Sequence, residues 1–571
     1  MKTKKITSLL FAGTIALSLT GCIEEYTPQN GAPSQEQVNN APGAFTSLVS
    51  NLTGNLSGKR LYSPNQDNWS VWDYGYTSFF ITRDVEGQDE VAAGSNPYSA
   101  WYSDVNYLAS GYAVGQFPWT LYYGWINDCN KVIAAGGAAN YAEPDETHKH
   151  GVGIAYAMRA MFYLDLCRMY AQKPYSEDHN ALTTIKADEV RTAAESRNQE
   201  RMTWDEAFEF MLKDLDAAEK DLADYQRSDK YTPDESVVYG LKARVYLEKQ
   251  DWANAEKYAK LAQQGYTVMN ESQFLDHSNG FNTPDNNSSW MFATQFKDTD
   301  PSITTNDGND SWGSCMITEN SLGDDVAGYA TTFGGPQVID KHLYSTIPNT
   351  DFRKKCWLPF SADTLAEEKK TSELLNLLKP YSCHQDDDGA KLLYRLGQVN
   401  KYGYGGLNVK FRPKSGILDE KYKVWEVSVP LMRVEEMKLI EIEAAGMQDL
   451  ARGKQLLIEF AKTRDPQYVY GKHNEAYYNS KTSEFQNEVW WQRRVELWGE
   501  GFATFDIKRL NKGIIRSYAG TNHIEGARWN TTSVPNWMVW TFTATESGVN
   551  GGMTLNPDPV QPSEDSPAFK W

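Results

Sequence analysis

The feature that most limits the fold is a pair of adjacent segments, 236–249 and 252–264, separated only by Gln250 and Asp251. Small and aromatic residues recur along both segments at positions typical of a tetratricopeptide repeat, which is a hairpin of two packed helices. The matching positions are Tyr239, Tyr246, Ala255 and Ala262, whereas Ala243 and Ala259 replace the usual Gly and Phe. A hairpin of this kind cannot bury its apolar face alone, so we expect it to stack on further helices.

Other segments carry the same helical periodicity. Apolar residues recur every three or four positions along 155–170, and the pattern stops before Pro174. The segment 203–222 opens on Thr203 with Glu206 three residues later, which is a capping box. A further helical pair is predicted over 430–446 and 452–464. The sequence therefore predicts a mainly α protein built on tetratricopeptide-like helical hairpins.

The composition changes between about residues 273 and 429, where helical periodicity is lost and Gly, Asn, Asp, Ser and Thr alternate with short apolar runs such as 290–294. This composition indicates loops and short strands, and loops on a rigid scaffold commonly carry binding residues. We therefore divide the chain into a signal peptide (1–21), a flexible tether (22–43), an N-terminal helical region (44–272), a loop-rich inserted lobe (273–429), C-terminal helical pairs that dock on the scaffold (430–515) and an irregular C-terminal segment (516–571).

The first 21 residues have the form of a secretory signal, with three lysines followed by an apolar run and small residues. The run ends in Leu-Thr-Gly before Cys22, which resembles the lipobox of bacterial lipoproteins. That resemblance implies lipidation of Cys22 and a lipid anchor in the outer membrane. The acidic pair Glu24 and Glu25 resembles an export signal to the cell exterior. The alternatives are an ordinary secretory signal with a chance cysteine, and a merely solvated tether.

Charge and composition limit the kinds of partner and ligand that the chain is expected to bind. The chain of 571 residues has 56 basic and 75 acidic side chains and a net charge of −19, which argues against nucleic acid as a partner. Its 18 Trp, 33 Tyr and 22 Phe exceed the needs of an ordinary core and suggest stacking surfaces for a ligand. The six cysteines show no zinc-site spacing, and we expect buried free thiols.

Two motifs resemble signatures of the SusD/RagB family of surface nutrient-binding lipoproteins. Residues 159–175 are similar to the family's RAxxYxxLxxxYGxxPY helix, with Ala171 or Gln172 where a Gly is common. Residues 493–510 resemble RRxELxxEGxRxxDLxRW, with departures at Ala503, Thr504 and Leu510. A third, approximate match covers 439–446 and 461–465. Together these segments extend over most of the chain.

The resemblance implies a helical scaffold with a variable binding lobe. It also implies capture of an oligosaccharide, without catalysis, and its transfer to a TonB-dependent outer-membrane transporter of the SusC type. The charged residues of the second motif have a structural interpretation, since they could form an ion-pair network that docks the C-terminal helix. These residues are Arg493, Arg494, Glu496, Glu500, Asp506 and Arg509.

No catalytic motif is present in the sequence. It contains no GxSxG, P-loop, HExxH or dinucleotide fingerprint. His148 and His150 near Glu146, and the acidic run 386–388, are interpreted as solvated loops rather than metal sites. We therefore expect no enzyme activity, no cofactor and no metal.

A sugar-binding site needs aromatic rings for the CH faces and polar side chains for the hydroxyls. Two polar, aromatic-rich segments offer this mixture, one over 68–106 and the other over 306–333. We predict Trp101 and Trp312 as stacking platforms. The predicted polar or accessory contacts are Arg83, Asn106, Asp310 and Tyr329.

Three rival interpretations remain open. The same architecture could bind a peptide or another nutrient in an extended groove with free backbone donors. A surface glycosidase would need two carboxyl groups facing each other across a cleft. A pure assembly scaffold would have no exposed aromatic cluster outside its partner interface.

Overall fold

The computed structural model describes residues 43–58, 71–92, 96–136, 145–192, 194–278, 281–282, 288–305, 308–321, 326, 328–331, 335–400, 402–474, 478 and 481–571. The predicted signal peptide, Cys22 and all but the last residue of the predicted tether lie outside these ranges. Residues 45–571 form one compact unit. Helices dominate this unit, and its strands pair in three two-stranded sheets within the described ranges, so the mainly α prediction is confirmed.

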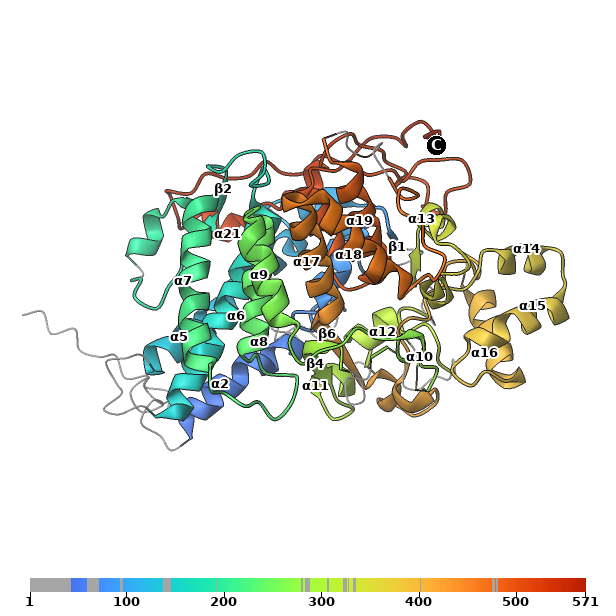
Figure 1. Cartoon of the computed structure of the whole chain (residues 1–571), viewed down its shortest axis with the longest axis horizontal. Helices are drawn as coiled ribbons and strands as arrows, with labels where there is room; N and C mark the ends of the chain where they lie inside the picture. Colours follow the sequence, from blue (N-terminus) through green and yellow to red (C-terminus); the bar gives the residue numbers. More distant parts are fainter. Residues whose placement is uncertain are drawn as a thin grey trace, which may run out of the picture. The chain divides into compact units, whose positions relative to one another are not determined.

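The scaffold consists of long helices packed in sequence order (Figure 1). Helix α5 packs on α6, α6 on α7, and α8 on α9, with α7 also contacting α8. The bounds are α5 Ala113–Gly136, α6 Glu146–Tyr170, α7 Trp204–Leu222, α8 Glu235–Glu248 and α9 Trp252–Ala262. The predicted hairpin is therefore α8–α9, and the first signature motif forms the second half of α6.

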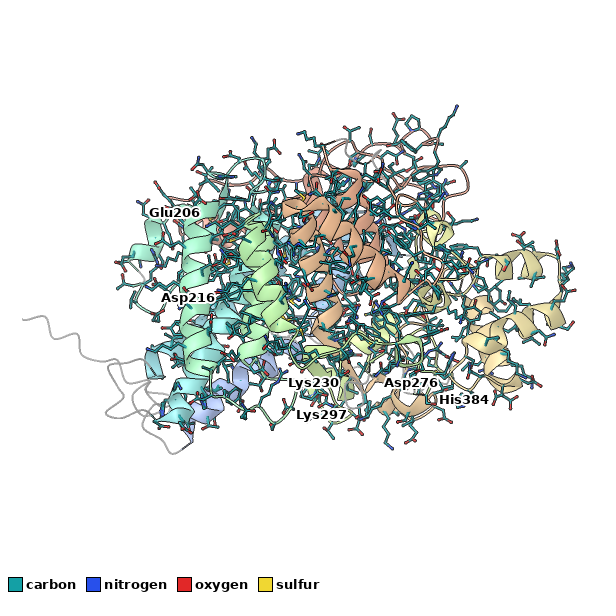
Figure 2. The ribbon with its side chains drawn as sticks, viewed as in Figure 1. Glu206, Asp216, Lys230, Asp276, Lys297 and His384 are labelled. Atoms are coloured by element: carbon teal, nitrogen blue, oxygen red, sulfur yellow. The ribbon has the colours of Figure 1, made fainter. Side chains whose placement is uncertain are left out.

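The capping box of α7 forms as predicted. The Thr203 hydroxyl accepts the Glu206 N–H at 3.3 Å, and the Glu206 carboxylate accepts the Thr203 N–H at 2.8 Å. Figure 2 shows Glu206 near the start of α7 and Asp216 further along it. Two otherwise unpaired backbone donors are thereby satisfied, which fixes where the helix begins.

The C-terminal helices complete the scaffold. Helix α17 packs against α9 and forms a second hairpin with α18, and α19 contacts both. Their bounds are α17 Val434–Gln448, α18 Leu450–Lys462, α19 Glu484–Glu496 and α20 Ala503–Arg509. The first four residues of the predicted helix 430–446 belong instead to a strand.

The inserted lobe enters and leaves through one antiparallel ribbon. Strand β4 (Trp290–Phe296) pairs with β6 (Val427–Arg433), with Trp290 opposite Arg433 and Phe296 opposite Val427. The ribbon brings the lobe back beside its starting point. The other sheets pair β1 (Glu90–Ala92) with β5 (Gln337–Ile339), and β2 (Leu182–Ile185) with β3 (Arg201–Thr203).

The lobe contains more helix than its composition suggested. Helix α16 (Asp387–Val399) begins where the Asp386 carboxylate accepts the Gly389 N–H at 2.8 Å. Leu392, Leu393 and Leu396 are buried along one side of it. The acidic run therefore caps a helix. The lobe's other helices are α10 Glu271–Phe274, α11 Pro301–Thr304, α12 Trp312–Met316, α13 Lys341–Thr346, α14 Ser361–Glu367 and α15 Thr371–Leu378.

Short helices join the scaffold at both ends of the chain. They are α2 Ala44–Gly54, α3 Ser78–Val85, α4 Ser99–Tyr102 and α21 Ala544–Ser547. No helix in the described ranges is both long and apolar enough to cross a membrane.

Much of the aromatic excess fills the core. The largest side chains that are fully buried include nine tryptophans, which come from the scaffold, the lobe and the C-terminal segment. They are Trp101, Trp204, Trp290, Trp312, Trp357, Trp425, Trp490, Trp491 and Trp529. The composition therefore overstates the area available for stacking on a ligand.

Candidate functional site

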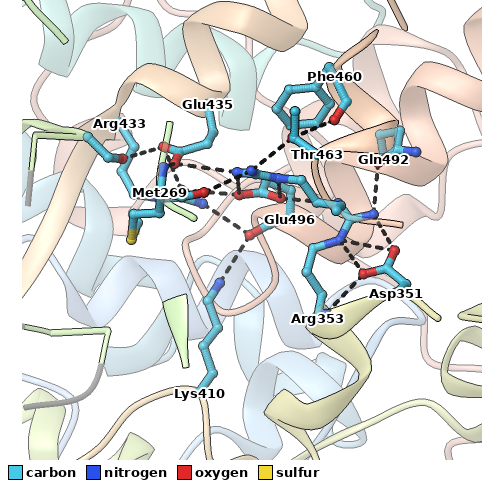
Figure 3. Close-up of polar contacts among 12 residues, drawn as sticks. Met269, Asp351, Arg353, Lys410, Arg433, Glu435, Phe460, Thr463, Gln492 and Glu496 are labelled. Carbon is cyan, nitrogen blue, oxygen red and sulfur yellow. Dashed lines mark hydrogen bonds and ion pairs between the residues drawn. The ribbon is translucent and has the colours of Figure 1, made fainter. Parts of the chain in front are cut away.

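A buried ion-pair network surrounds Glu496 at the end of α19 (Figure 3). Its carboxylate lies 3.1 Å from Arg353, 3.1 Å from Arg464 and 3.3 Å from Arg433. These arginines come from the lobe, from the turn after α18 and from the end of β6. The network therefore joins the lobe to both sides of the scaffold.

Charge balance explains why this cluster is tolerated inside the protein. Burial by itself would raise the pKa of Glu496, but Arg464, Arg433 and Arg353 outweigh burial and hold that pKa well below its usual range. Asp351 balances Arg353 with a contact of 2.7 Å, and Glu435 balances Arg433 at 2.8 Å. A buried charge that lost its partner would cost several kcal/mol, about 3–5.

The other five charged residues predicted for this network are also paired and buried. Glu500 bonds Lys410 at 2.7 Å and Arg433 at 2.8 Å, and Arg494 bonds Asp89 at 2.5 Å. Arg493 pairs with Asp506, and Arg509 pairs with Glu443 and Asp506. The motif builds the fold, as its structural interpretation predicted.

The two segments predicted to bind ligand do meet in space. Tyr74 and Tyr98 of the first segment have hydroxyl groups 2.5 Å apart, and burial, with a smaller contribution from the Cys315 thiol of α12, raises the pKa of both. Asn96 donates to the Gly335 carbonyl at 2.8 Å. Part of the first segment therefore packs directly on the second.

The two predicted stacking platforms lie beneath the surface of this junction. Trp101 and Trp312 both have 0% of their surface exposed. Trp101 contacts Trp72 and Phe117, while Trp312 packs edge-on against Phe411 at 4.8 Å. The expectation that their ring faces are exposed is wrong, because both rings are packed inside the hydrophobic core.

Two of the predicted polar contacts are also buried. Arg83 is 2% exposed and bonds Asp165 at 2.9 Å, with its guanidinium over the Phe505 ring. Asp310 is 3% exposed. Neither side chain is available to a ligand at the surface in this conformation. Tyr329 is half-buried, and burial, followed by Cys315 and Asp310, raises its pKa to about 12.

Asn106 is the predicted residue that lies at the surface, and it has aromatic neighbours. Its Oδ1 accepts the Gln561 N–H at 3.1 Å, and its Nδ2 makes no hydrogen bond within the described part of the chain. Tyr107 is 51% and Tyr112 is 49% exposed, and their rings pack edge to face with centroids 5.2 Å apart. We call Asn106, Tyr107 and Tyr112 the tyrosine corner.

Sequence reasoning missed the two tyrosines. They flank Ala109-Ser110-Gly111, a short turn-forming run that interrupts helical periodicity, and this is the signal that could have found them. Trp69 and Phe333, which belong to the same two predicted segments, lie outside the described residues.

Within the described ranges, no group of three or more His, Cys, Asp or Glu side chains could hold a metal ion. His148 pairs with Asp145, which caps α6, and His150 pairs with Asp224. The five cysteines other than Cys22 are buried free thiols. Burial raises the pKa of Cys167 and Cys356 to about 12, so these thiols are poor nucleophiles.

Comparison with known proteins finds a family match over part of the chain. Residues 70–247, which include the helix of the first motif, match the SusD-like family described as starch-binding and associating with the outer membrane. This match covers about a third of the chain and agrees with the resemblance that the first motif carries. No curated protein matches the chain.

Solved SusD-like structures share the fold over nearly the whole chain. A SusD-like carbohydrate-binding protein from Bacteroides vulgatus has 19% identity and a TM-score of 0.65, covering 90% of this chain and 97% of that protein. A putative sugar-binding protein from the same species has 18% identity and a TM-score of 0.64, with coverages of 91% and 99%. Surface glycan-binding protein A from Bacteroides thetaiotaomicron has 14% identity and a TM-score of 0.57, with coverages of 90% and 98%.

Proposed function

We propose that this chain is a non-catalytic, lipid-anchored protein of the outer cell surface that captures an oligosaccharide and passes it to a TonB-dependent transporter of the SusC type. The observation that carries the binding role is the tyrosine corner on a SusD-like scaffold. Two exposed rings beside a free amide offer both kinds of contact that a sugar needs, a CH-stacking face and a hydrogen-bond donor.

A peptide ligand is less well supported. Peptides commonly add a strand to an exposed sheet edge, where free backbone groups give the affinity. Strands β4 and β6 are buried apart from Gln295, and every residue of β1 and β5 is buried. These strands offer a peptide no exposed edge.

Binding is tested with an array of neutral and acidic oligosaccharides and the chain from Glu24 onward. The tightest ligand is then titrated by calorimetry. We expect a dissociation constant in the micromolar to millimolar range, about −8 to −4 kcal/mol. Peptide binding without any glycan binding would overturn the proposed substrate class.

The anchor and the transporter need a separate experiment. A Cys22→Ala variant expressed in the native host should leave the outer-membrane fraction, and wild type should co-purify with a TonB-dependent transporter from detergent-solubilised membranes. Retention of the variant in the membrane would contradict anchoring through Cys22. Absence of any such transporter from the purified wild type would contradict the delivery role.

A further inference from the structure

A groove of about 450 Å³ lies between the lobe and the C-terminal segment. Its walls come from the region of α13 and α14, from the glycine-rich turn 402–406 and from the loop 520–528. The volume is within the range of small-molecule sites. Its lining combines aromatic and polar side chains, which are Lys341, Phe360, Asp363, Tyr402, Glu525 and Arg528.

Tyr402 is held in place at the mouth of the groove. Its ring is 44% exposed, and its N–H donates to the Asn400 side chain at 3.2 Å. Asn400 in turn donates to the Gly403 carbonyl at 2.8 Å, and Gly403 has φ of 89°, which glycine adopts without strain. The turn therefore fixes the backbone of Tyr402, so a ligand that stacks on its ring need not order this part of the main chain.

The opposite wall is fixed by buried contacts. His523 is 1% exposed, and its ring nitrogens lie 2.8 Å from the Tyr102 hydroxyl and 3.1 Å from the Gln88 carbonyl. Asn522 accepts the Lys341 N–H at 2.8 Å and donates to the Ile339 carbonyl at 2.9 Å. The loop is thus bonded to the start of α13, and the groove exists before any ligand arrives.

The charges that line the groove balance. Lys341 and Arg528 are cationic, and Asp363 and Glu525 are acidic. The Asp363 carboxylate accepts the N–H groups of Tyr404 at 2.7 Å and Gly405 at 3.2 Å. The Lys341 ammonium lies 5.3 Å from the centre of the Phe360 ring and makes no ion pair within the described part of the chain. Directional donors and acceptors are present without a net charge.

We propose that this groove is a binding site for a neutral oligosaccharide, with one pyranose ring stacked on Tyr402 and its hydroxyl groups bonded to Lys341 and Asp363. A flat ring with hydroxyl groups at its rim matches one exposed aromatic face beside polar groups of both signs. The site is separate in sequence from the tyrosine corner, and it rests on the proposed glycan-binding function.

The test uses the array above and then calorimetry with the neutral glycan that binds most tightly. Tyr402→Ala and Lys341→Met should each weaken binding by about tenfold or more, whereas Tyr402→Phe, which keeps the ring, should bind within about threefold of wild type. Lys391→Met is the matched control, because Lys391 is an exposed lysine on α16 whose ion pair is with the exposed Asp388. Melting temperatures confirm that every variant is folded.

The outcomes separate the two proposals. Unchanged binding by both Tyr402→Ala and Lys341→Met would overturn the groove site and leave glycan capture standing. Exclusive binding of acidic glycans would overturn the neutral class. No glycan binding by wild type would overturn the proposed function and the groove site together.

Discussion

The ion-pair network around Glu496 and the aromatic junction around Trp312 are both buried. The sequence predicted the structural role of the charged residues correctly but not the burial of the aromatic residues. Six charged residues of the second motif were predicted to be structural, and each of the six is paired inside the protein. The aromatic residues were predicted to face a ligand, but Trp101 and Trp312 are enclosed. A dense set of opposite charges on two consecutive helices, α19 and α20, and the turn between them needs partners when it is buried, whereas an aromatic ring in a polar loop suits a core and a surface equally well.

The largest effect is expected from Glu496→Ala. The substitution leaves Arg353, Arg433 and Arg464 without their shared carboxylate, and the free energy of unfolding should fall by about 3–5 kcal/mol. Urea denaturation measures this loss. A loss below about 1 kcal/mol would mean that the network is solvated and not structural.

Trp312→Ala tests the aromatic side of the comparison. Removal of a fully buried indole should cost about 3–5 kcal/mol, since it leaves a cavity against Phe411. The matched substitution Trp571→Ala removes an indole that is 51% exposed and should cost less. If thermal unfolding shows equal, small losses for both, Trp312 lies at the surface in solution.

Acid should weaken the network. The folded pKa of Glu496 is depressed below its ordinary value of 4.5, so the unfolded chain binds a proton that the folded one does not. The stability that Glu496 contributes is present above about pH 4.5 and is lost as the pH falls toward the folded pKa, by at most about 1.4 kcal/mol per pH unit. Glu496→Gln should therefore lose less stability than wild type between pH 5 and pH 3 in urea titrations. Parallel pH profiles would contradict this assignment.

The smallest effect is expected from Asp388→Ala. Asp388 pairs with Lys391 at 2.8 Å, but both side chains are mostly exposed, with 90% and 63% of their surfaces accessible. Such a pair contributes about 0.5 kcal/mol or less. A urea midpoint that shifts as far as that of Glu496→Ala would contradict the expectation that exposed ion pairs contribute less to stability than buried ones.

Local patterns predicted the scaffold well, including the capping box at Thr203, the α8–α9 hairpin and the α17–α18 pair. They missed α16, because its Asp-rich cap was interpreted as a solvated loop. The predicted ligand segments do converge, because Tyr74 of the first segment interacts with Cys315 of the second. Which rings stay exposed depends mainly on packing between distant segments, and the turn-forming run beside Tyr107 is the local signal that distinguishes it from Trp101.

Exposed aromatic rings are expected to bind glycan, while the buried tryptophans and ion pairs stabilise the fold. The most direct measurement of this expectation is calorimetric titration of a Tyr107→Ala/Tyr112→Ala double variant with the array's tightest glycan, accompanied by a thermal melt. If the tyrosine corner holds that glycan, the double variant should bind it at least about tenfold more weakly at an unchanged melting temperature. If the groove holds it, Tyr402→Ala should show the same loss. Wild-type affinity in all of these variants, with binding lost in a folded Trp312→Phe variant, would contradict this expectation.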